Sequence, residues 1–215
     1  MLIGMRAQRH ARLLTIAITL GLWAASAFSA AADQPDEKLE KVPPEEYPIY
    51  DRVIEAKFLT SQTKLVIIDR LTVGELRPDL PPPTREFFKE FDFFAGKLQP
   101  ETVTDFLFKT RRHSRLEARF NFGVRYQFVS DGVLEEPMVF LAPVPAGLTR
   151  FDPIRIGVLG FSRVGFNARE DQALVYVGDF RPDGSGAGFL VLLHRIGHEW
   201  KITDTEVLWV AREDE

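Results

Sequence analysis

Cysteine is absent from this 215-residue sequence, and that absence excludes several kinds of chemistry. Without a thiol the chain cannot form disulfide bonds, thiolate zinc sites, iron–sulfur clusters or a cysteine nucleophile. A bacterial lipoprotein is excluded too, because its lipid is attached to a cysteine at the cleavage point. The folded chain must therefore be held together by hydrophobic burial and hydrogen bonds.

Motifs of common enzymes are also missing. The chain contains neither a GxSxG nucleophile elbow nor an HExxH zinc motif. The glycines at positions 184, 186 and 188 precede an expected strand, so they lack the helix N-terminus that holds a phosphate. We therefore expect no cofactor, and no motif indicates an enzyme class.

The first 32 residues predict a secretory signal peptide. Three arginines at positions 6, 9 and 12 precede an uncharged apolar run from Leu13 to about Phe28, and small residues follow up to Ala32. The run is short for a membrane span, which needs about 20 apolar residues. We expect cleavage after Ala32 and a periplasmic or secreted protein without a stable membrane anchor. Retention of the segment as an anchor is the alternative.

Acidic residues outnumber basic residues in the expected mature chain. The whole chain has 27 Lys and Arg against 31 Asp and Glu. Cleavage after Ala32 would remove three arginines and no acidic residue, which leaves 24 basic residues and a net charge of −7. Nucleic acid is not an expected partner, because proteins bind it chiefly through Lys and Arg. We expect a small ligand or another envelope protein instead.

The composition changes twice after the expected cleavage point. Residues 33–46 (DQPDEKLEKVPPEE) are strongly charged with little to bury, which predicts a disordered acidic linker. Residues 47–215 are expected to form a single α+β domain. Apolar residues recur at helical spacing from Pro48 to about Leu59, and KLVIID at 64–69 predicts a strand.

Two further helices are predicted between residues 84 and 110. The first is expected to be capped by Thr84 and ended by Gly96, with Phe87, Phe91 and Phe94 on a core-facing side. The second is expected to start at Pro100 or Glu101, because proline is favoured in a first helical turn.

The second half of the chain predicts strands. Apolar residues alternate with polar ones from Leu116 to Phe128, which indicates a long strand with a possible bulge at Gly123. Residues 137–144 predict another strand and residues 143–153 a loop. The segments 154–166, 173–180, 187–196 and 199–211 are joined by turns too short for a crossover helix, so neighbouring strands must be antiparallel. The expected fold is α+β, with N-terminal helices packed on a curved antiparallel sheet that ends in this four-strand meander.

Two motifs in this region carry a resemblance. SRVGFN at 162–167 and QALVYVG at 172–178, followed by a glycine-rich turn and a tryptophan-containing hairpin arm, resemble an uncharacterised family of exported bacterial proteins. The resemblance is close over residues 160–211 and loose over 47–70, and it implies export but no assigned activity. Members of that family often carry two cysteines in the turn where this chain has RPDGSGAG. The order of helices and sheet is also similar to NTF2-like and cystatin-like domains, as a fold analogy only.

The charged residues around these motifs raise the question of a site. We interpret them as architecture, with Val164, Phe166, Leu174 and Tyr176 forming one apolar face. The polar residues of the same stretch are then the rim and turn of the sheet: Arg163, Asn167, Arg169, Glu170 and Asp171.

Two possible metal sites are not favoured. His194 and His198 have the spacing of helical zinc ligands, but they lie on an expected hairpin, where residues four apart along a strand are about 13 Å apart. We expect His194 to face Glu199 or Lys201 across the ladder instead. Residues 179–190 resemble a calcium loop at Asp179, Asp183 and Gly184, yet Arg181 and Leu190 stand where oxygen ligands are needed. We therefore expect no metal.

One concentrated group of basic residues remains as a ligand-binding candidate. RRHSR at 111–115 supplies Arg111, Arg112 and Arg115, and Arg119 follows. With Arg125 they could bind an acidic ligand, a phosphate or an anionic membrane surface, although a solvated helix end is the simpler interpretation. His113 within this run is a conceivable general base.

Two hypotheses for function follow. The first is a non-enzymatic exported domain that binds a ligand or another envelope protein. The alternative is a small hydrolase or isomerase with an aspartate base, Asp179 or Asp204, inside a cone-shaped sheet, because an inward-facing carboxyl group would have a raised pKa. An envelope structural protein without a ligand is a third possibility. An enclosed pocket around a buried carboxylate or histidine would favour the enzyme, and an exposed apolar groove would favour the binding domain.

Overall fold

The computed structural model describes residues 39–77, 82–135, 157–181 and 183–212. The expected signal peptide, the strand expected at 137–144 and the loop expected at 143–153 lie outside these residues. Within them, no helix is both long and apolar enough to cross a membrane. The described residues all belong to one compact unit.

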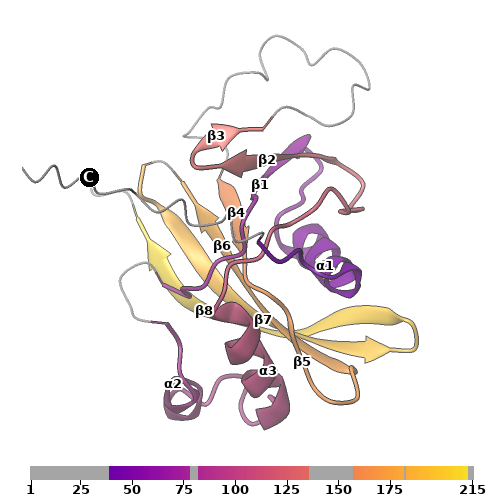
Figure 1. Ribbon diagram of the computed structural model, residues 1–215, viewed down its shortest axis with the longest axis vertical. Helices are drawn as coiled ribbons and strands as arrows, with labels where there is room; N and C mark the ends of the chain where they lie inside the picture. Colours follow the sequence, from indigo (N-terminus) through magenta and orange to yellow (C-terminus); the bar gives the residue numbers. More distant parts are fainter. Residues whose placement is uncertain (1–38, 78–81, 136–156, 182, 213–215) are drawn as a thin grey trace, which may run out of the picture. The chain divides into compact units, whose positions relative to one another are not determined.

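A mixed β-sheet forms the centre of this unit (Figure 1). Its eight strands are β1 (Leu65–Asp69), β2 (Arg125–Ser130), β3 (Val133–Leu134), β4 (Val158–Phe161), β5 (Gly165–Phe166), β6 (Gln172–Phe180), β7 (Gly186–Ile196) and β8 (Glu199–Ala211). The order across the sheet is β3-β2-β1-β4-β6-β7-β8, and β5 pairs with β6 beside this path. The fold is α+β, as expected.

The expectation of a purely antiparallel sheet is wrong for its first strands. β1 pairs in parallel with both β2 and β4. The chain between β1 and β2 contains two helices, so it is long enough for the crossover that parallel strands need. From β4 onward, β6, β7 and β8 are successive antiparallel neighbours, in agreement with their short turns.

Helices lie on both faces of the sheet. They are the 3-10 turn η1 (Pro44–Glu46), α1 (Tyr47–Lys57), α2 (Arg85–Glu90) and α3 (Pro100–Thr110). Residues of α1 share a hydrophobic cluster with Val175, Val177, Val191 and Leu193. Residues of α2 and α3 share a second cluster with the alternate residues Leu174, Tyr176, Leu190 and Leu192.

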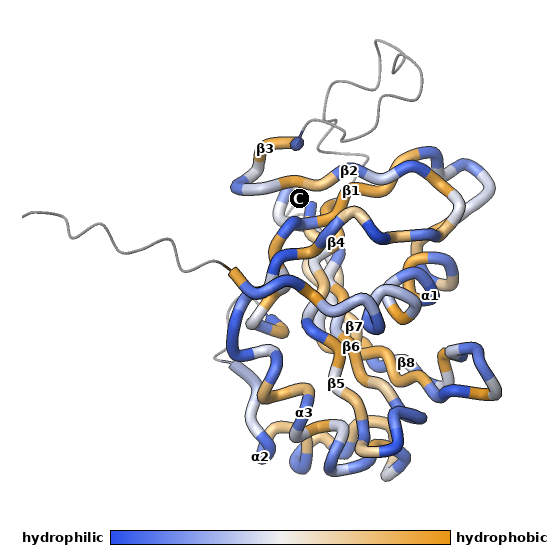
Figure 2. The backbone as a smooth tube through the Cα atoms, turned by 45° about the vertical axis from the view of Figure 1, so that its right-hand side comes forward, coloured by the Kyte–Doolittle hydropathy of each residue, from blue (hydrophilic) through white to orange (hydrophobic). Residues whose placement is uncertain are grey.

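Because successive strand residues point to opposite faces, β6 and β7 are covered on both sides. Figure 2 shows the hydrophobic residues concentrated along these central strands. This arrangement corrects the single apolar face expected from the SRVGFN and QALVYVG motifs. Val164 packs in the cluster of α1, whereas Leu174 and Tyr176 pack in the cluster of α2 and α3.

The strand expected from Leu116 to Phe128 is only partly formed. β2 begins at Arg125, and the preceding residues have no ladder. The amide of Glu117 binds the Tyr47 hydroxyl at 2.6 Å, and the amide of Asn121 binds the Asp51 carboxylate at 2.9 Å. The alternation therefore predicted the burial of Leu116, Phe120 and Phe122, although Ala118 is exposed. Side chains of α1 take the place of a neighbouring strand.

The first of the two helices between residues 84 and 110 is shorter than expected. The Thr84 hydroxyl accepts a hydrogen bond from the amide of Phe87, which confirms the predicted cap. The helix ends at Glu90 and not at Gly96, because left-handed φ angles at Asp92 and Phe94 are incompatible with a continuing helix. As a result Phe91 is 59% exposed, whereas Phe94 is buried. The second helix begins at Pro100, one of the two predicted starts.

The end of the expected acidic linker belongs to the fold. Lys41 forms a parallel bridge with Arg115, and the amide of Val42 donates to the carbonyl of Arg115 at 3.0 Å. The side chains of Val42 and Glu46 are both buried. Composition predicted a solvated segment here because its few anchoring residues are surrounded by charged ones.

Candidate functional site

A buried ion pair connects η1 to the SRVGFN motif. Glu46 is 1% exposed, and its carboxylate accepts from Nε and Nη2 of Arg163 at 3.0 and 2.9 Å. The same carboxylate accepts from the Tyr50 hydroxyl at 2.7 Å and from the amide of Val164 at 2.9 Å. Nη1 of Arg163 donates to the Ser114 hydroxyl at 2.8 Å. The carboxylate and the guanidinium together therefore connect η1, α1, the SRVGFN motif and the segment that contains Ser114.

These contacts satisfy the polar atoms of the network completely. Among the described residues, no buried side-chain nitrogen or oxygen lacks a hydrogen-bond partner. Burial, followed by the charge of Glu46, raises the pKa of Tyr50 well above its usual value. Arg163 was expected on the rim of the sheet, and its burial corrects that interpretation. We regard the network as a structural clamp, because its groups bind one another and leave no atom for a ligand.

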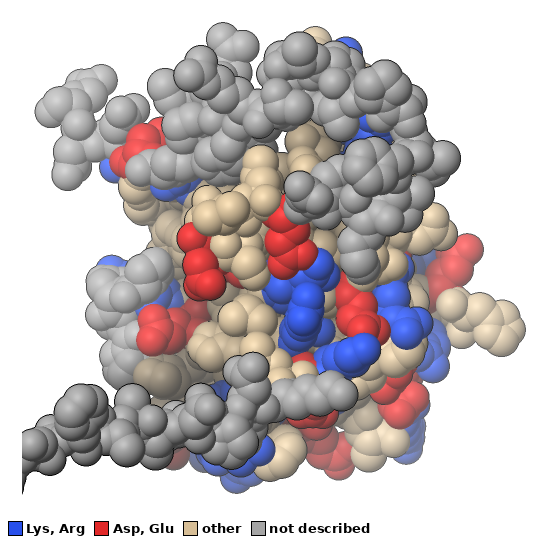
Figure 3. All heavy atoms as spheres, turned by 45° about the horizontal axis from the view of Figure 1, so that its top comes forward, with Lys and Arg blue, Asp and Glu red and all other residues tan. Residues whose placement is uncertain are grey.

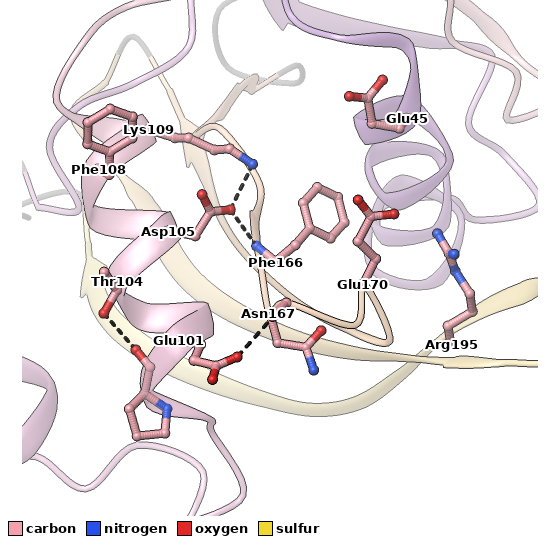
Figure 4. A pocket seen from close by; sticks show the side chains of 12 residues that line it. Glu45, Glu101, Thr104, Asp105, Phe108, Lys109, Phe166, Asn167, Glu170 and Arg195 are labelled. Carbon is pink, nitrogen blue, oxygen red and sulfur yellow. Dashed lines mark hydrogen bonds and ion pairs between the residues drawn. The ribbon is translucent and has the colours of Figure 1, made fainter.

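An open groove lies beside this clamp, and Figure 4 shows its lining. Its volume is about 700 Å³. The walls come from η1, from one side of α3, from β5 with the turn that follows it, and from the end of β7. The lining residues are Glu45, Pro100, Glu101, Thr104, Asp105, Phe108, Lys109, Phe166, Asn167, Ala168, Glu170 and Arg195.

The floor of the groove is held in place by α3. The Asp105 carboxylate accepts from the amide of Phe166 at 2.8 Å and pairs with Lys109 at 2.7 Å. The ammonium of Lys109 also donates to the carbonyl of Val164 at 3.2 Å and lies 4.9 Å from the centre of the Phe166 ring. These contacts balance the charge of Lys109 within the protein.

The turn between β5 and β6 forms another part of the wall. The Asn167 side chain accepts from the amides of Asp171 and Gln172 at 3.0 Å, and its own amide group donates to Gln99 and Asp171. Asn167 was expected on the rim and is instead buried. Glu170, in the same turn, has a left-handed φ of 52° and an exposed side chain. The buried asparagine therefore fixes the backbone that presents Glu170.

Two carboxylates of the groove have no partner in the described part of the chain. The side chains of Glu45 and Glu170 are exposed and form no hydrogen bond or ion pair with any described residue. Glu101 makes one long contact, with the amide of Ala168 at 3.3 Å. Arg195 places its guanidinium 4.7 Å from the centre of the Trp200 ring. The six ionisable residues of the lining carry a net charge of −2.

A second groove lies on the other side of α3. It has a volume of about 520 Å³ and is lined by Pro83, Thr84, Arg85, Glu86, Thr104, Leu107, Phe108 and Arg111. Thr104 and Phe108 line both grooves. Phe108 is 72% exposed, the largest exposed fraction among the large hydrophobic side chains of the described residues. The outer face of α3 therefore presents an aromatic ring between two hollows.

The aspartates proposed as catalytic bases do not lie in these grooves. The Asp204 carboxylate on β8 pairs with Lys97 at 2.8 Å, and this hydrogen bond lowers the pKa of Asp204. Asp179 on β6 pairs with Arg181 at 3.2 Å and packs against the backbone of Gly157. The structure places the two aspartates on different strands and does not bring either of them together with His113.

The basic residues predicted to bind an acidic ligand are distributed around the end of α3. Arg111, Arg112, Arg115 and Arg119 are all exposed. Arg119 pairs with Glu117 at 3.2 Å, while Arg111 alone reaches the second groove. Figure 3 shows Lys and Arg interspersed with Asp and Glu on one face of the molecule. His113 contacts the carbonyl of Thr72 through Nδ1 at 2.5 Å.

The two histidines of the hairpin behave as residues of a sheet. His194 lies opposite Lys201, which is one of the two expected registers. Its Nδ1 contacts the Thr203 hydroxyl and its Nε2 contacts the Gln172 amide, both at 3.0 Å. His198 is exposed in the turn. The described residues contain no group of three or more His, Asp or Glu that could hold a metal ion.

Sequence reasoning did not find Glu46, the clamp or the groove. Glu45 and Glu46 are adjacent and chemically identical, yet one faces solvent and the other is buried. The single local signal was the four-residue spacing of Glu46 and Tyr50, which places both side chains on one face where a helix begins. Glu170 was noted only as a turn residue, because its neighbours in the groove are distant in the sequence.

Comparisons with known proteins add no assignment. No protein-family model, curated protein or solved structure matches this chain. The resemblance of the SRVGFN and QALVYVG motifs to exported bacterial proteins therefore stays an expectation from sequence.

Proposed function

We propose that this chain is a non-enzymatic domain of the bacterial cell envelope that binds another envelope protein through the outer face of α3. The observation that carries the proposal is the exposed ring of Phe108 between two grooves. Isolated apolar side chains on a surface are ordinary. Interface cores are enriched in aromatic side chains, and the few residues that dominate the binding energy are anchors that fill pockets. An exposed ring with a groove on either side offers both an anchor and pockets for a partner.

The surroundings of Phe108 support the same assignment. Protein interfaces combine an apolar centre with a polar rim. Here Pro100, Ala168 and Phe166 provide further apolar surface, and charged side chains surround them. The grooves are open on the surface, which suits a segment of a partner protein better than an enclosed substrate.

Export to the envelope rests on the N-terminal sequence. The arginines, the apolar run and the small residues up to Ala32 support a signal peptide and a periplasmic or secreted location. With such a location, the partner would be another exported protein or the periplasmic part of a membrane protein.

The alternative of a general acid–base enzyme has less support. A catalytic base must be free to accept a proton and must have a suitable pKa. The pKa of Asp204 is lowered by its pairing with Lys97, which makes it a weaker base, and Asp179 is paired with Arg181. The cone-shaped sheet that this alternative requires remains a prediction from fold analogy.

Site-specific photo-cross-linking in the native host tests the proposal. A photoreactive phenylalanine analogue at position 108 is expected to give one adduct with an envelope protein, which mass spectrometry identifies. The same analogue at Val133 is the control, because Val133 is 68% exposed but lies on β3. The purified partner is then expected to bind the Phe108→Ala variant at least tenfold more weakly than the wild type. Equal adducts at both positions, or equal affinities, would overturn the proposal.

A further inference from the structure

We infer that the groove between α3 and the β5–β6 turn receives a peptide segment that carries a lysine or arginine next to a large apolar side chain. This inference rests on the proposed function and specifies the chemistry of the partner. It is argued from the charges of the groove that the protein leaves unbalanced and from the aromatic rings beside them.

The carboxylates of the groove are available to a ligand, whereas one of its two cations is not. Lys109 is held by Asp105, by the carbonyl of Val164 and by the Phe166 ring. Glu45 and Glu170 have no partner among the described residues. The guanidinium of Arg195, the other cation, lies over the Trp200 ring. The groove therefore attracts positive charge more strongly than negative charge.

Glu45 and Glu170 reach the groove from separate elements. Glu45 belongs to η1, and Glu170 belongs to the β5–β6 turn, which Asn167 fixes through its hydrogen bonds. Figure 4 shows both side chains on the α1 side of the groove, opposite α3. The next residue after Glu45 is the buried Glu46 of the clamp, so the position of Glu45 is fixed by the fold. Two carboxylates from separate elements therefore line the same side of the groove, where they attract a cationic side chain.

The opposite wall provides an apolar contact. Phe108 and Lys109 are consecutive residues of α3, and the ammonium of Lys109 lies over the Phe166 ring. A large aliphatic or aromatic side chain that covers Phe108 would remove apolar surface from water, which stabilises the complex by about 25 cal/mol per Å² of buried area. The two walls together therefore select for a cation and an apolar group in one short segment.

Titration with defined peptides tests this inference. The probes are a short blocked peptide with alternating lysine and phenylalanine in a glycine–serine background, its counterpart with glutamate for lysine, and its counterpart with alanine for phenylalanine. Binding to the full chain is followed by NMR chemical-shift changes at the amides of residues 100–109 and 165–171. The lysine–phenylalanine peptide is expected to bind at least tenfold more tightly than either counterpart, and to bind more weakly at high salt.

A charge exchange makes the test decisive. Glu45→Lys with Glu170→Lys is expected to lose at least tenfold in affinity for the lysine peptide and to gain affinity for the glutamate peptide. Glu90→Lys is the matched control, because Glu90 is an exposed carboxylate on α2 outside the groove and should change neither affinity.

The possible outcomes separate this inference from the proposed function. Equal affinity for the lysine and glutamate peptides, with loss of both in Phe108→Ala, would overturn the cationic partner and leave the α3 face as the binding surface. Shift changes confined to residues outside α3 and the β5–β6 turn would overturn both. Reversed peptide preference in the charge-exchange variant would support both.

Discussion

Arg163 and Glu46 form an ion pair 2.9 Å long, although 117 residues separate them in the sequence. Both side chains are almost completely buried. Removing two charges from water is costly, and the cost is offset here because the hydrogen-bonding groups of both side chains have partners in the protein. The pair therefore connects the beginning of the folded unit to the sheet, and its integrity should determine whether residues 40–46 stay in place.

Loss of the carboxylate charge is expected to be strongly destabilising. Glu46→Gln leaves the buried Arg163 guanidinium with only the exposed Glu40 carboxylate, 3.9 Å away, as a counter-charge. We expect a loss of about 3 kcal/mol in the free energy of unfolding. Urea denaturation followed by circular dichroism measures this change. Glu45→Gln is the neighbouring control, and its effect should lie within about 0.5 kcal/mol, because Glu45 is exposed.

The same pair should show strong coupling in a double-mutant cycle. Arg163→Met is expected to be destabilising alone, because it leaves the Glu46 carboxylate buried without its cation. The double variant Glu46→Gln and Arg163→Met should be less destabilised than the sum of the single changes, because neither charge remains. Simple additivity of the two effects would contradict the clamp.

The pH dependence of stability should carry a contribution from Asp51. Burial, opposed by a hydrogen bond from the amide of Asn121 and reinforced by the charge of Glu55, raises the pKa of Asp51 from 3.8 to about 6. In this pH window the folded state binds more protons than the unfolded state, so the free energy of unfolding falls as the pH rises from about 4 to about 6.

Asp51→Asn removes this titration and retains an oxygen that can accept from Asn121. We expect the variant to be more stable than the wild type at pH 7 and close to it at pH 4. The quantity to measure is the difference between the two proteins in urea denaturation at a series of pH values, since other carboxyl groups titrate equally in both. A difference that does not change with pH would show that Asp51 has an ordinary pKa.

Gly165 is expected to tolerate no side chain. A Cβ atom at this position would lie 2.4 Å from the Cβ atom and 2.5 Å from the Cα atom of Phe106. Gly165→Ala must therefore push α3 away from β5, and we expect a loss of about 1–3 kcal/mol. NMR shift changes should spread over residues 100–110, which form one wall of the groove. A variant with unchanged shifts in α3 and unchanged stability would show that this contact is not close.

Two phenylalanines of α3 should behave in opposite ways. Phe106 is fully buried, and Phe106→Ala is expected to cost about 3–5 kcal/mol in the free energy of unfolding because it leaves a cavity. Phe108 is 72% exposed, and Phe108→Ala should change the free energy of unfolding by less than about 0.5 kcal/mol. Thermal or urea unfolding of the two variants makes the comparison. A large loss of stability in Phe108→Ala would mean that its ring is part of the core and not a binding surface.

Several elements could be predicted from the sequence because their signals are local. The Thr84 cap, the start of α3 at Pro100 and the antiparallel series β6, β7 and β8 each depend on residues that are neighbours in the chain. The segment from residue 116 to residue 124 shows the limit of such signals. Its alternation marks most of the buried positions, but the amides of Glu117 and Asn121 bind Tyr47 and Asp51 of α1, which no periodicity identifies.

The candidate site was less predictable than the fold. Arg163 and Asn167 were placed on a rim because charged and amide side chains are usually exposed. Their burial depends on partners from distant segments, Glu46 for the one and Gln99 for the other. The groove likewise combines residues of η1, α3, the β5–β6 turn and β7, and no stretch of sequence contains more than a part of it.

By itself, the sequence determined that the chain lacks every chemistry that depends on a thiol, that its last third pairs as a meander, and that its class is α+β. Composition and short-range periodicity decide these properties. Only the tertiary structure decided that β1 pairs in parallel with β2 and β4, that Glu46 is buried while Glu45 faces solvent, and that Phe108 lies between two hollows. These properties depend on which distant segments of the chain pack against one another. Burial and hydrogen bonding in the folded chain supply the free energy that favours this packing.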